Sequence, residues 1–193
     1  MMGAAMVLLE TTGRCPAGAL AAVALEHLGR PYELTVVSEG VFLERDGRPG
    51  PRYFDGERTL WGRDAVAALL TDCLRAAGAS HDVAAVAEAV RTRFQPAVLE
   101  WVRANDDEAR SAASTRLRDA LSAIEARLDD ASEKSRASDG IAIVLTPVAM
   151  FLERSPGFAT EVSALAEQAR RATHLRAYER AKERIAHAAT TAR

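Results

Sequence analysis

The hydrophobic pattern of this 193-residue chain changes near residue 80, and this change constrains the fold more than any other feature. Up to that point, short apolar runs bounded by turn residues alternate with helical spacing, which is typical of a mixed α/β domain. Beyond it, apolar residues recur at helical spacing, as in Val83, Val86 and Val90, almost to the C-terminus. The sequence therefore predicts two domains, an α/β domain over residues 1–79 and an all-helical domain over residues 80–193.

The first domain begins with a predicted strand, a helix and a second strand. Residues 6–9 form a short apolar run, residues 19–28 are rich in alanine and leucine, and residues 31–37 alternate and contain β-branched side chains. Short turns between these segments favour a right-handed parallel crossover. Farther along, Asp55-Gly56 separates two short extended runs and predicts a β-hairpin, after which a helix is expected from Gly62.

The helical half carries a leucine-rich stripe and several expected breaks. Leu117, Leu121 and Leu128 lie on one face at helical spacing, opposite charged side chains. The segment that follows Asp139 is apolar on nearly every side, so it should form a buried central helix. We expect kinks at Pro96 and Pro147, a capped break at Asn105–Asp107, a loop over Ser132–Ser138, and a buried helix over Gly140–Arg154 with Asp139 as its cap.

Composition and charge exclude several classes of function. The formal net charge is -2 at pH 7, which indicates neither a nucleic-acid partner nor an acidic membrane surface. The apolar runs fall short of the roughly 18–20 residues of a membrane span, and the N-terminus does not resemble a signal peptide. The 2 cysteines imply no disulfide framework, and the 4 histidines show no metal-ligand spacing. These features predict a cytoplasmic protein without a metal site.

Arg14-Cys15-Pro16 lies between the first predicted strand and the first predicted helix. Pro16 suits the first helical turn, where its missing N–H removes no hydrogen bond. A cysteine at this point faces unpaired backbone N–H groups and the positive end of the helix dipole, and both favour the thiolate, the nucleophilic form. Cys15 is therefore the candidate catalytic residue, with a small buried hydrophobe as the alternative interpretation. Cys73, on the inner face of a helix, is expected to be such a core residue.

The order of these elements resembles the cytosolic glutathione transferase superfamily, in which a thioredoxin-like domain precedes a helical domain. Cys15-Pro16-Ala17 resembles the Cys-Pro start of its omega-type and glutaredoxin-like members, and Gly50–Gly56 resembles the family's cis-proline and hairpin. Leu117–Leu128 and Asp139–Ala142 resemble its leucine-rich helix and the start of its buried helix. The resemblance implies an α/β thioredoxin-like N-terminal domain plus an all-α C-terminal domain, assembled as a homodimer.

The same resemblance implies roles for individual residues. In the family the residue before the cis-proline pairs its backbone with the cysteinyl part of glutathione, and these two positions fall to Gly50 and Pro51. Members usually present Glu-Ser at the next helix to hold the γ-glutamyl carboxylate, whereas this chain has Gly62 and Arg63. Arg63 either binds an anion through its planar guanidinium or is a solvated surface residue. Besides Cys15, the candidate thiol- or substrate-binding residues are Arg14, Pro16, Gly50, Pro51, Arg63 and Asp64.

Two functions are open at this point. The first is an enzyme in which Cys15 attacks, or activates a thiol that attacks, an electrophilic small molecule, by thiol transfer, conjugation or thiol-assisted isomerisation. Its thiol would be glutathione or another low-molecular-weight thiol, and the departure at Gly62 and Arg63 counts against glutathione. The second is a non-catalytic ligand-binding or scaffold protein that kept the fold and lost the glutathione site. Neither function involves nucleic acid or a membrane.

Overall fold

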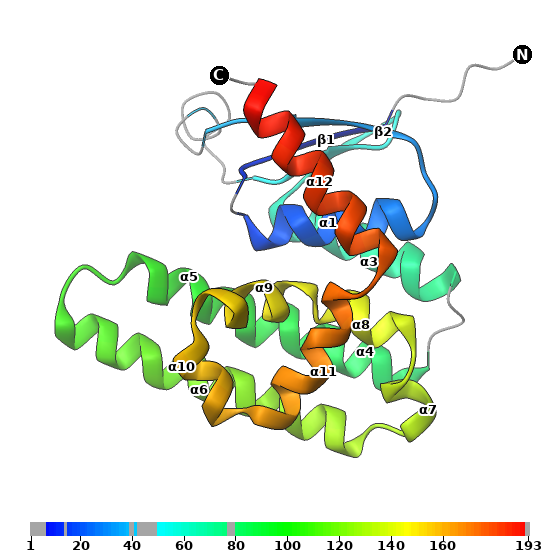
Figure 1. Ribbon diagram of the computed structural model, residues 1–193. Coiled ribbons are helices and arrows are strands. Elements are labelled where there is room, and N and C mark those ends of the chain that lie inside the picture. Colours follow the sequence, from blue (N-terminus) through cyan, green and yellow to red (C-terminus); the bar gives the residue numbers. More distant parts are fainter. Residues whose placement is uncertain (1–6, 14, 39–40, 42–49, 77–79, 192–193) are drawn as a thin grey trace, which may run out of the picture. The chain divides into compact units, whose positions relative to one another are not determined.

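The computed structural model describes residues 7–13, 15–38, 41, 50–76 and 80–191 (Figure 1). The side chain of Arg63 lies outside this description. The chain forms two compact units. The first combines the residues up to Ala76 with those from His174 onward, and the second contains the residues between them. An α/β segment followed by a helical segment is the arrangement that the sequence predicts.

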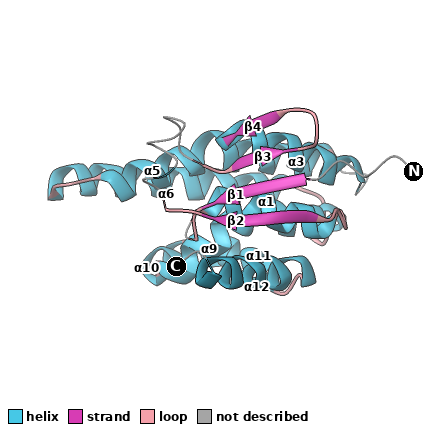
Figure 2. Cartoon of the chain, turned by 90° about the horizontal axis from the view of Figure 1, so that it is seen from above, coloured by secondary structure: helices cyan, strands magenta, loops and turns pink. Residues whose placement is uncertain are grey.

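A four-stranded mixed sheet forms the centre of the first unit (Figure 2). The strand order is β2-β1-β3-β4, with β1 parallel to β2 and antiparallel to β3, and with β3 antiparallel to β4. The predicted parallel crossover and the predicted hairpin are therefore both confirmed. The bounds are β1 (Val7–Thr11), β2 (Tyr32–Val36), β3 (Arg52–Phe54), β4 (Thr59–Trp61), and for the helices α1 (Pro16–His27) and α3 (Gly62–Ala76).

Helix α1 is buried on almost every side because it packs against β1, α3 and the C-terminal helix. Its C-terminus closes with two backbone hydrogen bonds, from the Gly29 N–H to the Glu26 carbonyl at 3.2 Å and from the Arg30 N–H to the Leu25 carbonyl at 3.1 Å. Gly29 has a φ of +63°, a left-handed conformation in which a β-carbon would be strained. The chain therefore turns directly from α1 into β2.

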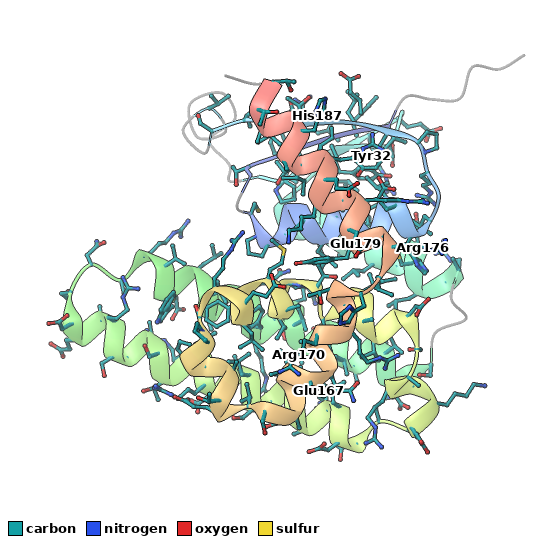
Figure 3. All side chains as sticks on the ribbon, viewed as in Figure 1. Tyr32, Glu167, Arg170, Arg176, Glu179 and His187 are labelled. Carbon is teal, nitrogen blue, oxygen red and sulfur yellow. The ribbon has the colours of Figure 1, made fainter. Side chains whose placement is uncertain are left out.

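The last helix, α12 (Arg176–Thr191), packs against α1 and β2 in the first unit (Figures 1 and 3). The sequence instead predicts that residues 174–193 belong to the helical domain. Periodicity predicts that this segment is helical but does not say which surface it covers. Tyr178 and Ala181 form its buried face, while Arg176, Glu179 and His187 are exposed. Helix α12 therefore belongs to the first unit.

The second unit is all helical, and its breaks differ in part from those predicted. The helix in which a kink is expected at Pro96 contains a π-helical turn just before the proline, where the Gln95 N–H donates to the Val90 carbonyl. The bounds are α4 (His81–Ala89), the π-helical turn η1 (Val90–Phe94), α5 (Gln95–Arg103), α6 (Asp107–Asp130), α7 (Glu133–Arg136), α8 (Asp139–Val144), α9 (Thr146–Arg154), α10 (Pro156–Glu161) and α11 (Ser163–Thr173).

Three expectations for the second unit can be compared directly with its helix ends. Asp106 caps α6 as predicted, because its carboxylate accepts the Ala109 N–H at 2.7 Å. The loop expected over Ser132–Ser138 instead contains the short helix α7, which Ser132 caps. Ser138, rather than Asp139, caps the buried segment, and a break at Leu145 ahead of a proline divides that segment into α8 and α9.

Candidate functional site

Cys15 is the N-cap residue of α1. Its φ and ψ are -76° and 112°, so the residue is extended while its carbonyl already accepts the Ala19 N–H at 3.0 Å. Its Sγ accepts the backbone N–H of Gly18 at a distance of 3.4 Å. Pro16 follows within the first turn. The helix start that the sequence predicts is therefore confirmed, and it places a sulfur atom where the first turn offers its N–H groups.

The strand before Cys15 holds the cysteine loop in place. The Thr12 carbonyl accepts the Cys15 N–H at 3.2 Å, and the Thr11 carbonyl accepts the Val37 N–H at 2.9 Å. Thr11 itself is fully buried, whereas Cys15 is half-buried and keeps some exposure. The thiol thus lies at the end of β1, on a backbone that hydrogen bonds fix and within reach of solvent.

The predicted cis-proline is confirmed, because the Gly50–Pro51 peptide bond is cis. Glu10 lies opposite Arg52 in the antiparallel register of β1 and β3, so Pro51 lies at the end of the sheet to which Thr11 belongs. The Pro51 carbonyl accepts the Gly62 N–H at 2.7 Å, which joins the start of β3 to the start of α3. The first unit thereby contains three predicted positions: the cysteine loop, the cis-proline and the start of α3.

The two predicted basic residues lie wholly or partly outside the described part of the chain. Arg14 lies outside the described residues, and the side chain of Arg63 does so too, although its backbone belongs to the first turn of α3. Asp64 is exposed in that same turn, where a carboxylate suits the positive end of the helix dipole. Gly62 has a φ of +48°, so a side chain at this position would be strained.

The second cysteine has the character expected of a core residue. Cys73 is 2% exposed, and its thiol donates to the Ala24 carbonyl with a sulfur–oxygen distance of 3.5 Å. Burial, together with the nearby negative charge of Asp72, raises the pKa of this thiol to about 12. Cys73 is therefore a neutral packing residue near neutral pH. Among the described residues neither cysteine is in a disulfide.

Sequence reasoning missed a charged pair on the same sheet. The Arg52 guanidinium donates to the Glu10 carboxylate at 2.7 Å and lies 5.5 Å from the centre of the Trp61 ring. The strand register, which pairs Glu10 with Arg52 and Arg52 with Trp61, could have revealed this contact once the pairing was known. Trp61 is half-buried.

Trp101 is part of an aromatic cluster in the second unit. Its ring lies edge-on to Phe151 at 5.8 Å and to Phe158 at 6.0 Å between ring centres, and its indole N–H donates to Ser114 at 3.1 Å. Within the described parts of the chain no group of acidic, histidine or cysteine side chains could hold a metal ion. None of the described helices has the length and apolar character needed to cross a membrane.

Comparisons with known proteins identify the fold. No protein-family model matches the chain, and no curated protein matches it in sequence. Solved structures do match. A glutathione transferase from Methylococcus capsulatus has a TM-score of 0.73 at 12% identity, covering 94% of this chain and 99% of its own. The glutathione transferase URE2P6 from Phanerochaete chrysosporium, in complex with oxidised glutathione, has a TM-score of 0.71 at 15% identity. The match covers 97% of this chain and 100% of that transferase.

A third similar structure is the nitrogen regulation fragment of the yeast prion protein Ure2p. Its TM-score is 0.70 at 12% identity, and the match covers 95% of this chain and 98% of the fragment. Identities this low establish the fold alone. The chain thus has the glutathione-transferase fold, with a thioredoxin-like unit and a helical unit, as its sequence predicts.

Proposed function

We propose that this protein is a thiol-dependent transferase of the glutathione-transferase type, with Cys15 as its nucleophile. One observation carries the proposal: the Sγ of Cys15 accepts the Gly18 N–H at the N-terminus of α1. A backbone N–H and the positive end of a helix dipole both stabilise a thiolate relative to a thiol. The buried Cys73 lacks such an arrangement, so only Cys15 is suited to attack an electrophile.

The simplest reaction for this arrangement is thiol transfer. The Cys15 thiolate attacks one sulfur of a small disulfide, a new S–S bond forms at Cys15, and the old S–S bond breaks. The departing sulfur leaves as a thiolate and takes a proton from water. A second low-molecular-weight thiol, as its thiolate, then attacks the sulfur that Cys15 holds and restores the Cys15 thiolate. Conjugation and thiol-assisted isomerisation would use the same nucleophile on a carbon electrophile.

Two of the three positions that the resemblance implies for a glutathione site have the expected character, and they support glutathione as the thiol. A cysteine lies at the helix start, and a cis peptide bond precedes β3. The third position differs, because Gly62 and Arg63 replace the usual Glu-Ser pair that holds the γ-glutamyl group. Several similar structures contain glutathione or its derivatives, among them the complexes of Ure2p. We therefore propose a low-molecular-weight thiol as co-substrate, with glutathione as the first to be tested.

The alternative is a ligand-binding or scaffold protein without catalysis. It is favoured by Gly62 and Arg63 in place of the Glu-Ser pair, and by the fold shared with a nitrogen regulation fragment. Incubation with oxidised glutathione, followed by mass spectrometry of proteolytic peptides, separates the two functions. We expect a mixed disulfide on Cys15, and the same adduct in Cys73→Ser but not in Cys15→Ser. A folded wild-type protein that carries no adduct on Cys15 would favour the alternative.

A further inference from the structure

The end of β1 and the first turn of α1 approach each other closely at Thr11 and Gly18. Thr11 is 0% exposed, and its hydroxyl donates to the Thr12 carbonyl at 3.3 Å. A β-carbon at position 18 would lie 2.6 Å from the β-carbon of Thr11, well inside the 3.4 Å at which ordinary contact begins. Because backbone geometry fixes a β-carbon, no rotation of the Thr11 side chain removes this contact. Only glycine fits position 18 while Thr11 is present.

Thr11 cannot withdraw from this contact without disturbing the sheet. Its carbonyl accepts the Val37 N–H at 2.9 Å, and Thr11 is paired with Val36 at the end of β2. The next carbonyl, of Thr12, accepts the Cys15 N–H at 3.2 Å. Since the strand is held by its neighbour, a side chain at position 18 would displace the first turn of α1 instead.

Displacement of this turn would act directly on the thiol. The N–H that Sγ of Cys15 accepts belongs to Gly18, so the residue that contacts Thr11 also donates to the sulfur. We infer that Thr11 is a positioning residue for the nucleophile: by its close contact with Gly18 it sets the place of the N–H that stabilises the Cys15 thiolate. This inference rests on the proposed role of Cys15.

The test is the pH dependence of alkylation of Cys15 by iodoacetamide in the full chain. In Gly18→Ala we expect the midpoint of the pH–rate profile to rise by about one pH unit, with the high-pH plateau unchanged, because the thiolate loses much of a hydrogen bond. The matched control is Gly13→Ala, two residues from Cys15, where a β-carbon would meet Val36 at an ordinary 3.8 Å. Its midpoint should equal that of the wild type.

A second variant distinguishes positioning from a general loss of structure. In Thr11→Gly/Gly18→Ala the β-carbon of Thr11 is gone and the alanine fits, so we expect a helical circular dichroism spectrum and the wild-type midpoint. Failure of this double variant to fold, or a midpoint that stays raised in it, would overturn the inference. A wild-type midpoint in Gly18→Ala would also overturn the inference about Thr11, but it would leave the proposed role of Cys15 as the nucleophile standing. Wild-type Cys15 that reacts as slowly as Cys73 would overturn both proposals.

Discussion

The guanidinium of Arg184 lies 4.1 Å from the centre of the Tyr32 ring and donates to the Tyr32 carbonyl at 2.7 Å. A second nitrogen of Arg184 lies 3.2 Å from the Glu26 carboxylate. One side chain of α12 therefore contacts both the edge strand β2 and the helix α1 that begins at Cys15. An uncovered edge strand offers unpaired backbone groups to other chains, and α12 lies against this one.

Arg184→Ala should weaken the first unit. We expect the free energy of unfolding to fall by about 1–2 kcal/mol, because a cation–π contact and a hydrogen bond to a carbonyl are lost together. Arg180→Ala removes an exposed arginine of the same helix and is the matched control. Urea denaturation followed by circular dichroism measures both. Equal losses in the two variants would contradict the structural role of Arg184.

The two cysteines should differ in reactivity. At pH 7 we expect alkylation of Cys15 to be fast and that of Cys73 slow, because burial raises the pKa of Cys73 to about 12 and keeps it a thiol. Peptide mapping after a short exposure to iodoacetamide measures both rates in the same sample, and labelling in denaturant shows that both peptides are detectable. Equal slow labelling in the folded protein would argue against Cys15 as a nucleophile.

Asp55 should stabilise the hairpin in a pH-dependent way. Its carboxylate accepts the N–H groups of Arg58 at 2.9 Å and Glu57 at 3.0 Å and pairs with the Arg58 side chain, which lowers its pKa from 3.8 to about 2. Because the folded pKa is the lower one, this stabilisation is present above pH 3.8 and is lost as the pH falls towards 2.

The corresponding variant is Asp55→Ala. We expect its Tm at pH 7 to be roughly 2–4 °C below that of the wild type, the shift that accompanies the loss of one modest interaction in a chain of this size. The difference should shrink as the pH is lowered from 4 towards 2. Glu57→Ala, which removes an exposed neighbouring carboxylate, should show neither effect. A Tm difference independent of pH would mean that the charge of Asp55 is not responsible.

Arg63 should determine the affinity of the site for the carboxylate of an anionic ligand. If its guanidinium binds the γ-glutamyl carboxylate, Arg63→Ala should weaken glutathione binding by roughly 1.5–3 kcal/mol and leave binding of the dipeptide Cys-Gly unchanged. Isothermal calorimetry measures both. Arg75→Ala, a change at the far end of α3, provides the control. Unchanged glutathione binding in Arg63→Ala would assign this residue to the solvated surface.

Introducing the Glu-Ser pair that is usual in glutathione transferases is harder than the sequence suggests. Gly62 has a φ of +48°, so Gly62→Glu places a side chain in the left-handed region and should cost about 1 kcal/mol of stability before any gain in binding. Arg63→Ser carries no such backbone penalty, and it is the better first variant.

The resemblance also predicts a homodimer, with the helix that begins at Gly62 near the interface. Multi-angle light scattering at micromolar concentration should give twice the 20.7 kDa mass of one chain. A monomer under those conditions would contradict this prediction. A charge introduced by Ala67→Glu on the half-buried side of α3 should shift the population towards monomer if the interface lies there.

Local signals in the sequence determined where these helices and strands begin and end, and where the thiol lies along the chain. Pro16 after Cys15 marks the helix start, Gly29 its end, and Asp55-Gly56 the hairpin, because each acts through the backbone conformation of a few neighbouring residues. The same locality explains two errors. Serines cap helices as well as aspartates do, so the cap lies at Ser138 rather than Asp139, and a short helix forms where a polar loop was expected.

Only the tertiary structure decided which surfaces meet. Arg184 and the Tyr32 carbonyl are 152 residues apart, and no periodicity indicates that α12 covers β2 rather than the helical unit. The contact between Thr11 and Gly18 likewise depends on how closely a helix approaches a strand, which packing settles and sequence spacing does not. The sequence by itself determined where the thiol lies along the chain and that the first turn of α1 would cap it. The packing of α1 on β1 decided that position 18, whose N–H the sulfur accepts, has room only for glycine.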